Sequence, residues 1–188
     1  MGKILFLIGM ILCTATVLFG AGSIVSSNDD KNPVKTVDSV DLSKYTGKWF
    51  EIARYPNRFQ NKCAGEVTAK YSIKKENRLE VLNECAEADG DITKAVGEAK
   101  IVDKETNAKL KVRFAPGWLS WLPFVWGDYW ILELDEDYRY SVVGSPDRDY
   151  LWILSREPQL DEEIYSKLLV KIEKLGFDPN KLVKTRQE

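Results

Sequence analysis

The chain has 188 residues, of which 30% are charged and 44% are hydrophobic, and its formal net charge at pH 7 is −2. This length predicts one domain with a short leader, and the charge gives no basic surface for nucleic acid. There is no histidine, which excludes Ser-His and Cys-His nucleophile pairs, His-ligated haem and most zinc sites. We therefore expect no metal and no cofactor.

Residues 1–22 have the pattern of an export signal. Lys3 precedes an apolar run from Ile4 to Phe19, and small residues follow at positions 20–23. Together with the next two residues this run approaches membrane-spanning length, so the alternative to cleavage is an anchor retained within residues 1–25. The polar composition of residues 23–39 predicts a flexible linker. The folded domain is then expected over residues 40–188.

Eight segments have the alternation or the length of β-strands. Their predicted ranges are 47–55, 66–73, 79–85, 94–102, 109–114, 128–134, 138–143 and 150–154. Their mostly short connections indicate antiparallel neighbours, and eight strands in this order can close into an up-and-down β-barrel. The predicted fold class is thus all-β. A barrel of this size is just wide enough for one small ligand.

One α-helix is predicted after the last strand, packed on the outside of the barrel. Acidic residues at 161–163 suit its N-terminus, and Gly176 stands where a C-terminal glycine is expected. Its apolar stripe consists of Ile164, Leu168, Leu169, Ile172 and Leu175. Phe50 and Ile52, on the outer face of the first strand, are the expected contacts for this stripe.

The segment Gly47-Lys48-Trp49 matches the Gly-x-Trp motif of the lipocalin family. Gly127-Asp128-Tyr129 stands where that family has Thr-Asp-Tyr, with Gly replacing Thr, and Arg156 follows the last strand where the family has a single Arg. The stretches 49–54 and 146–156 look like the bacterial lipocalin, plant temperature-induced lipocalin and apolipoprotein D branch. The resemblance covers the chain from about residue 40 to its end.

The resemblance implies that Trp49 closes the barrel floor and that Arg156 packs across its indole, a cation–π contact worth about 0.5–2 kcal/mol. With Gly47, these are expected to be structural residues. The resemblance also implies a non-catalytic carrier of small lipophilic ligands such as fatty acids and lysophospholipids. The alternatives are an enzyme built on the same barrel and an interaction protein with a closed barrel. We expect an exported protein, periplasmic or associated with the outer membrane, that is a monomer or a homodimer.

Alternation along the strands gives a set of inner-face positions, which are the candidate ligand-binding residues. They are Ala53, Ala69, Tyr71, Val81, Asn83, Val112, Phe114, Tyr129, Ile131, Val143, Tyr150 and Trp152. The pattern alone fits a solid core equally well, and the resemblance favours a cavity. The Asn83 amide and the tyrosine hydroxyls of this set can orient a ligand. Glu51 falls on the same face as Trp49, where a buried carboxylate needs a partner or a proton.

The segment between the fifth and sixth strands, residues 115–126, is almost wholly apolar although its prolines and glycine predict a loop. If exposed, it presents three tryptophans and a phenylalanine to solvent, which is typical of a membrane or partner site. In lipocalins this loop lies at the open mouth of the barrel. Our hypothesis is docking on a membrane; the alternatives are a lid over the mouth or a dimer contact. The candidate membrane-contact residues are Trp118, Leu119, Trp121, Leu122 and Phe124.

Cys63 and Cys85 flank the second and third strands, whose hairpin brings these ends together. We predict a disulfide between them, since export places the domain in a compartment that permits one; the alternative is two free thiols. Arg54, Arg58 and Lys62 follow the first strand near the mouth. They can meet a carboxylate or phosphate headgroup, although solvated rim charges are the commoner outcome.

Overall fold

The computed structural model describes residues 33–75 and 77–187. The predicted leader and residues 23–32 of the predicted linker lie outside these ranges. Residues 33–39 pack on the barrel: Val34 is buried, and the Val37 backbone N–H donates to the Ile131 carbonyl at 3.1 Å. The folded unit therefore begins before residue 40. Within the described ranges, no helix has the length and apolar character needed to cross a bilayer.

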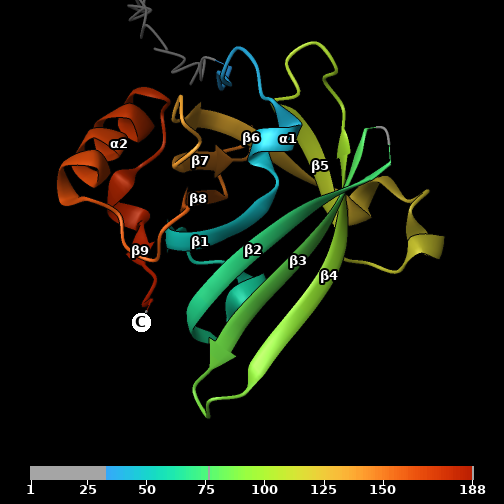
Figure 1. Cartoon of the computed structure of the whole chain (residues 1–188), viewed down its shortest axis with the longest axis horizontal. Helices are drawn as coiled ribbons and strands as arrows, with labels where there is room; N and C mark the ends of the chain where they lie inside the picture. The colour runs from blue at the N-terminus through green and yellow to red at the C-terminus, as the bar shows by residue number, and fades with distance from the viewer. Residues whose placement is uncertain (1–32, 76, 188) are drawn as a thin grey trace, which may run out of the picture. The chain divides into compact units, whose positions relative to one another are not determined.

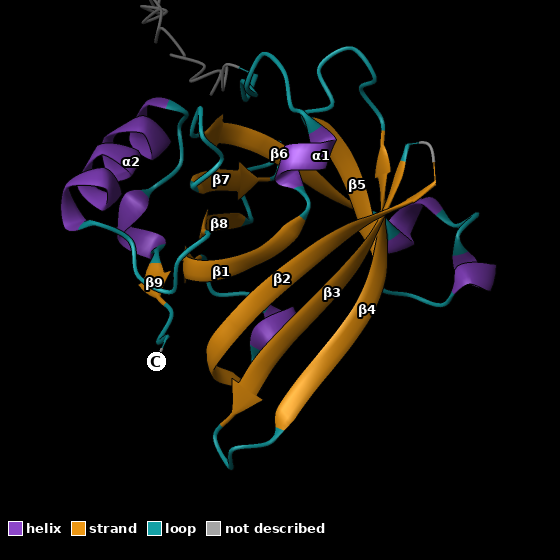
Figure 2. Ribbon diagram, viewed as in Figure 1, coloured by secondary structure: helices purple, strands orange, loops and turns teal. Residues whose placement is uncertain are grey.

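The predicted barrel is confirmed (Figures 1 and 2). Each strand pairs with the next in antiparallel fashion from β2 to β8, and β1 pairs with both β8 and β2, which closes the barrel. A short ninth strand, which we did not predict, pairs with β1. The strands are β1 (Gly47–Arg54), β2 (Cys63–Lys75), β3 (Arg78–Glu87), β4 (Ile92–Ile101), β5 (Lys109–Arg113), β6 (Gly127–Leu134), β7 (Tyr140–Gly144), β8 (Leu151–Ser155) and β9 (Val183–Lys184).

The helices lie outside the sheet. The short α1 precedes β1 and closes one end of the barrel, and α2 lies beside β1, β7 and β8 (Figure 1). One 3-10 turn lies in the β1–β2 connection, two lie in the β5–β6 connection and one lies in the C-terminal segment. The bounds are α1 (Leu42–Tyr45), α2 (Glu162–Lys174), η1 (Arg58–Gln60), η2 (Gly117–Leu119), η3 (Pro123–Val125) and η4 (Pro179–Lys181).

The start and end of α2 follow from its sequence. The Asp161 side chain accepts hydrogen bonds from the backbone N–H groups of Glu163 and Ile164 at 2.8 and 3.1 Å, which satisfies two of the donors left free at a helix N-terminus. Gly176 follows the last turn with a φ of +83°, a backbone conformation that costs glycine little and other residues more. The predicted helix is therefore present with its predicted ends.

Two hydrophobic clusters flank the sheet, one inside the barrel and one under α2. The inner cluster is formed by Val40, Tyr45, Trp49, Tyr71, Leu79, Val81, Ala99, Ile101, Ala108, Leu110, Tyr129, Ile131, Val143 and Leu154. The cluster under α2 is formed by Val34, Ile52, Ala53, Tyr55, Leu132, Val142, Leu151, Ile153, Tyr165, Leu168, Ile172 and Phe177. Opposite faces of the same strands feed the two clusters, which is why β1 and β7 are apolar on both faces.

Two predicted positions on β1 are wrong. The pairing of β1 with β8 shifts between Glu51 and Ala53, which marks a bulge. Because of this shift Ala53 packs in the cluster under α2 and not on the inner face. Ile52 contacts α2 as expected, but Phe50 is not part of that cluster; its ring is instead covered by the Lys48 ammonium, 4.3 Å from the ring centroid.

Candidate functional site

The closed end of the barrel is built on Trp49, which has no exposed surface. Its indole N–H donates to the Tyr45 carbonyl at 2.8 Å, and the Arg156 guanidinium carbon lies 3.8 Å from the centroid of its ring. Arg156 also donates to the carbonyls of Lys44 and Lys48 at 2.6 and 2.8 Å. This arrangement ties α1, β1 and β8 together, in the structural role expected for the pair.

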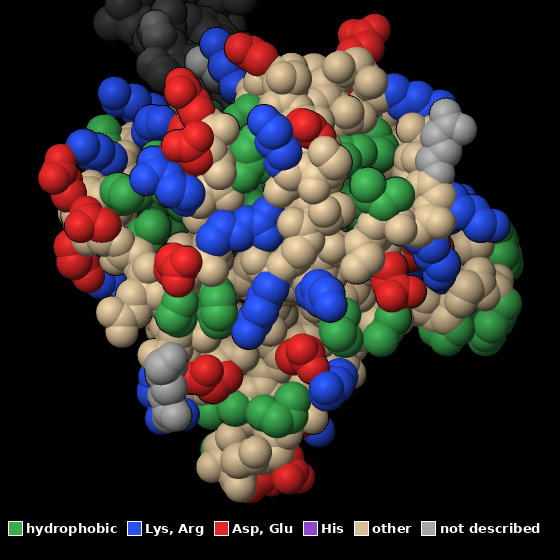
Figure 3. All heavy atoms as spheres, viewed as in Figure 1, with side chains coloured by type: hydrophobic (Ala, Val, Ile, Leu, Met, Phe, Trp, Pro, Cys, Tyr) green, Lys and Arg blue, Asp and Glu red, His purple; other side chains and the backbone are tan. Residues whose placement is uncertain are grey.

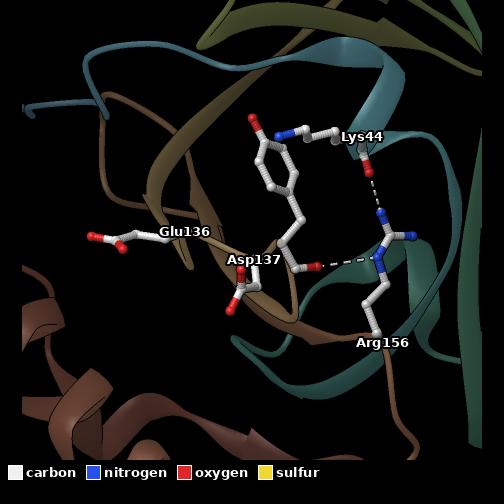
Figure 4. Close-up of a pocket in the computed structure, with 5 residues that line it drawn as sticks. Lys44, Glu136, Asp137 and Arg156 are labelled. Carbon is white, nitrogen blue, oxygen red and sulfur yellow. Dashed lines mark hydrogen bonds between the residues drawn. The ribbon is translucent and has the colours of Figure 1, made fainter.

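A pocket of about 360 Å³ lies on the outside of this closed end. Figure 4 shows Lys44 and Arg156 on one side of it and Glu136 and Asp137 on the other. The Arg156 Nε donates to the Tyr138 carbonyl at 3.2 Å, so the guanidinium is already engaged with backbone. No group of metal-ligating side chains is found in the described ranges, and we assign no ligand to this pocket.

Three buried tyrosines form a hydrogen-bonded chain just inside the closed end. The Tyr129 hydroxyl lies 2.9 Å from that of Tyr45 and 2.8 Å from that of Tyr71. Burial raises the pKa of all three phenols, because the charged phenolate is poorly solvated there. The three groups are therefore neutral and bonded to one another. Tyr71 and Tyr129 lie on the inner face as predicted, and Tyr45 is not among the predicted residues.

Solvent reaches the inner face at the other end of the barrel. Asn83 pairs with both Ala69 and Ala95 across the sheet, and all three are only partly buried. Deeper along the same strands, Val81 and Ala99 are fully buried. The inner face thus changes from a packed core at the closed end to small, partly exposed side chains at the open end, and we call this partly exposed part of the inner face, around Ala69, Asn83 and Ala95, the cup.

Asn83 carries an unusual polar atom in this cup. Its Oδ1 is buried and has no hydrogen-bond partner, although buried polar groups in proteins are nearly always paired. Such an acceptor costs stability unless something donates to it. Asn83 is therefore the inner-face residue with the clearest unused capacity to bind a donor on a ligand.

Aromatic rings surround the mouth of the cup. Tyr150 stacks on Trp152 with ring centroids 5.9 Å apart and an interplanar angle of 6°, and Phe59 lies 5.8 Å from Tyr150. On the opposite wall the Phe114 ring covers Gly97, where an added Cβ would come within 2.7 Å of it. Only glycine at position 97 lets this ring lie so close to β4.

Glu51 is 3% exposed and sits in a polar network beside the cup. One carboxylate oxygen accepts from Gln60 Nε2 and the other from Thr185 Oγ1, both at 2.6 Å. The Gln60 Oε1 in turn accepts from the Trp152 indole N–H at 3.1 Å. Burial raises the pKa of Glu51, and its hydrogen bonds and Arg54 oppose that rise. The network links the mouth loop, β8 and the C-terminal segment.

The apolar β5–β6 segment lies at the open end and stands away from the strands (Figure 1). Trp118, Trp121 and Phe124 are 75, 77 and 79% exposed, while Leu119 and Leu122 are partly buried. Figure 3 shows hydrophobic side chains gathered over this segment. In this conformation the segment does not cover the mouth as a lid, because the rings of Trp118, Trp121 and Phe124 face solvent.

Trp126 differs from the other two tryptophans of this segment, and it is not among the predicted membrane-contact residues. It is 8% exposed, lies under the side chains of Lys100 and Arg113, and donates its indole N–H to the Ser120 carbonyl at 2.9 Å. It anchors the segment to the barrel wall. Its burial depends on Lys100 and Arg113, which lie on other strands.

The predicted disulfide is confirmed: Cys63 and Cys85 are bonded, with their Cα atoms 5.5 Å apart. It joins the open ends of β2 and β3. In the chain-entropy treatment, closing a loop of 22 residues stabilises the fold by roughly 3 kcal/mol.

The family follows from comparison with known proteins. Residues 40–187 match the family model for the lipocalin-like domain. The chain is a lipocalin. It is 41% identical over 160 residues to temperature-induced lipocalin-1 of Arabidopsis thaliana, covering 84% of this chain and 85% of that protein. It is 37% identical over 163 residues to the outer membrane lipoprotein Blc of Escherichia coli K12, covering 86% and 88% of the two chains.

More distant lipocalins share the fold. Apolipoprotein D of Mus musculus is 32% identical over 187 residues, covering 95% of this chain and 94% of that protein. Insecticyanin from the tobacco hornworm Manduca sexta superposes with a TM-score of 0.66 at 23% identity, covering 82% and 85% of the two chains. Lipocalins generally bind small hydrophobic ligands and are generally not enzymes.

Most of the predicted lining residues of this lipocalin lie inside or at the mouth of the barrel. Tyr71, Val81, Tyr129, Ile131 and Val143 belong to the inner cluster, and Ala69, Val112 and Trp152 pack against it. Ala53 lies on the other face, as described above. Prediction missed Gln60 and Thr185, because their roles depend on a loop and a tail that carry no strand pattern.

Proposed function

We propose that this lipocalin binds and carries or stores small lipophilic ligands, such as fatty acids or lysophospholipids, in the open half of its barrel at a membrane surface. The observation that carries the proposal is the contrast along the inner face. Side chains fill the closed half, whereas the open half has small, partly exposed residues and an unpartnered buried acceptor on Asn83. A mostly apolar site with a few polar groups is the usual form of a small-molecule pocket.

A binding role is also favoured over catalysis. The chain contains no histidine, and both cysteines of the described domain are joined in a disulfide. The buried tyrosine hydroxyls bond to one another, and burial raises their pKa, so they are poor bases at neutral pH. The inner face therefore supplies groups that can orient a ligand but no activated nucleophile.

The carrier function is tested by native mass spectrometry of the protein purified from its natural host, followed by lipid extraction. We expect a fatty acid or lysophospholipid to be bound in a near-equal molar ratio. A protein that arrives empty, and whose tryptophan fluorescence does not change on adding these lipids, would contradict the carrier function. An interaction role for the barrel would then be preferred.

Docking on a membrane is the second part of the proposal. Trp118, Trp121 and Phe124 are exposed beside the mouth, and Phe59 and Ile92 are exposed at the same end of the barrel. Large exposed apolar patches mark interaction sites, and tryptophan prefers the interface between lipid headgroups and acyl chains. With the mouth against a bilayer, a lipid can enter the cup without crossing water.

Membrane docking predicts a specific loss on mutation. Substituting Trp118→Ser together with Trp121→Ser should weaken binding to phosphatidylcholine–phosphatidylglycerol vesicles about tenfold or more, because two apolar anchors are lost. Flotation or fluorescence titration measures this. Val102→Ser, at an exposed apolar residue of the closed end, is the matched control and should leave binding unchanged. Equal vesicle binding by the double variant and the wild type rules out docking by this segment.

We further propose that the protein is exported. Residues 1–22 have the pattern of an export signal, the disulfide suits an oxidising compartment, and a relative from Escherichia coli is named as an outer membrane lipoprotein. Periplasmic location or association with the outer membrane is therefore the proposed setting.

A further inference from the structure

β1 and β2 are paired only near the closed end of the barrel. The last registered pair is Phe50 opposite Thr68, and towards the mouth the two strands separate. The C-terminal segment, residues 183–187, occupies the space between them. It is held to β1 through β9 and through the Thr185 backbone N–H, which donates to the Ile52 carbonyl at 2.9 Å.

The same segment is also held to β2. The Glu66 backbone N–H donates to the Arg186 carbonyl at 2.8 Å. The Gln187 side-chain amide donates to the carbonyl of Glu51 on β1 at 2.8 Å and to that of Val67 on β2 at 2.9 Å. The gap in the barrel wall is therefore filled by hydrogen-bonded tail, and the groups that border it are fixed in place.

The β1 bulge turns Arg54 towards the inside of the barrel. Ala53 is opposite Ile153 of the cluster under α2, whereas Arg54 is opposite Trp152, which packs against the inner cluster. Residues directly opposite each other in a sheet share a face. Arg54 is therefore a cationic residue placed on the inner face by a backbone irregularity that simple alternation does not predict.

The Arg54 guanidinium has an unused donor. Its Nε is buried and lacks a hydrogen-bond partner; the Oε1 atom of Glu51 lies 3.7 Å away, beyond hydrogen-bond distance. Both Glu51 oxygens already accept from Gln60 and Thr185 at 2.6 Å. A buried N–H without a partner is costly, and this one is relieved if an acceptor binds beside it.

A pocket of about 170 Å³, which Arg54 helps to line, lies between the start of β2 and the C-terminal segment. It is lined by Arg54, Cys63, Ala64, Gly65, Val67, Val183, Lys184, Thr185 and Arg186. Three of these residues are cationic, and none of the lining residues in the described ranges is acidic. The Lys184 ammonium is paired with Glu162 at 2.7 Å, whereas the Arg54 Nε has no hydrogen-bond partner.

We propose that this pocket binds the anionic group, carboxylate or phosphate, of a single-chain lipid whose apolar chain lies in the cup, with Arg54 as the contacting residue. The proposal rests on the lipid-carrier function proposed above and adds the charge and orientation of the ligand. Arginine suits both anions, because its planar guanidinium donates in parallel to two oxygens. The pocket volume is adequate for a headgroup but not for a long acyl chain.

Three ligands with one common chain test the proposal: dodecanoate, dodecyl phosphate and dodecanol. We expect the wild type to bind the two anions at least about tenfold more tightly than the alcohol in tryptophan fluorescence titrations, as one charged hydrogen bond allows. Arg54→Gln should abolish this preference and leave dodecanol affinity unchanged, and Arg54→Lys should retain part of it. Lys94→Gln, at an exposed cationic residue of the open end, is the matched control and should keep the preference.

The possible failures are distinguishable. Equal affinity of the wild type for all three ligands, or a preference that survives Arg54→Gln, would overturn the anion pocket and leave the carrier function standing. Binding of none of the three by the wild type would instead count against the carrier function. In that case inorganic phosphate is titrated alone: Arg54-dependent binding supports the pocket with a free anion as its source, and absence of binding overturns it.

Discussion

The two ends of the barrel use similar residues in opposite ways. At the closed end an arginine and a tryptophan are fully engaged: Arg156 covers Trp49 and donates to several backbone carbonyls. At the open end Arg54 has a buried donor without a partner, and Trp118 and Trp121 face solvent. The Trp49 and Arg156 groups of the closed end form their hydrogen bonds within the protein. The open end keeps a buried donor that has no partner within the protein and is available to a ligand.

This difference indicates that the closed end contributes mainly to stability and the open end mainly to binding. Interiors with complete packing and complete hydrogen bonding contribute to the free energy of folding. Buried groups without partners lower stability, and they persist where binding requires them. We therefore expect substitutions at the closed end to act on unfolding and substitutions at the open end to act on binding.

The largest expected effect is at Trp49. Trp49→Ala removes a fully buried indole and the surface on which Arg156 packs, and should lower the free energy of unfolding by about 3–5 kcal/mol. Trp121→Ala, at a residue that is 77% exposed, should change it by less than about 0.5 kcal/mol. Urea unfolding followed by circular dichroism measures both. If both variants lost a similar free energy of unfolding, the closed end would not contribute more to stability than the open end.

A smaller effect, with a defined pH dependence, is expected at Glu51. Burial raises its folded-state pKa above the ordinary value of 4.5. Below pH 4.5 the Glu51 carboxyl is protonated in both the folded and the unfolded state, so its ionisation does not lower the free energy of unfolding. As the pH rises from 4.5 through the raised pKa, the unfolded state loses its proton first, so the free energy of unfolding falls.

Glu51→Gln removes this cost while keeping the shape of the side chain. Its amide oxygen can accept from Gln60, and its amide N–H₂ can donate to the Thr185 hydroxyl after that hydroxyl rotates. The stability of the variant relative to the wild type should therefore increase as the pH is raised from 4 to 8. Glu80→Gln, at an exposed position, controls for the loss of one charge. A stability difference that is constant or falls over this range would contradict the assignment.

Repeating local patterns were enough to predict the barrel. Strict alternation in Leu110 and Val112, and in Val67, Ala69 and Tyr71, is maintained by the pleat, so neighbouring positions fall on opposite faces. The amphipathic stripe of α2 was read in the same way, and its contact with Ile52 is observed. The disulfide was predictable because a hairpin fixes the distance between its two ends.

The errors occur where the pattern is interrupted. One extra residue at the β1 bulge moved Ala53 to the outer face and turned Arg54 inward. The burial of Trp126 has no local pattern to predict it, because it depends on Lys100 and Arg113 from other strands. The tail that fills the gap between β1 and β2 is an irregular segment, and its contacts join residues more than a hundred positions apart.

The sequence by itself determined the strand order, the helix that covers the barrel, the family and the floor built on Trp49, since each of these follows from short-range periodicity or a local motif. Only the tertiary structure decided which buried groups are satisfied and which are not. Whether a buried group finds a hydrogen-bond partner depends on how groups from several distant segments are oriented. One bulge in β1 is enough to exchange the faces on which Ala53 and Arg54 lie. The partners of Glu51, the unpaired donor of Arg54 and the acceptor on Asn83 are therefore properties of the assembled barrel.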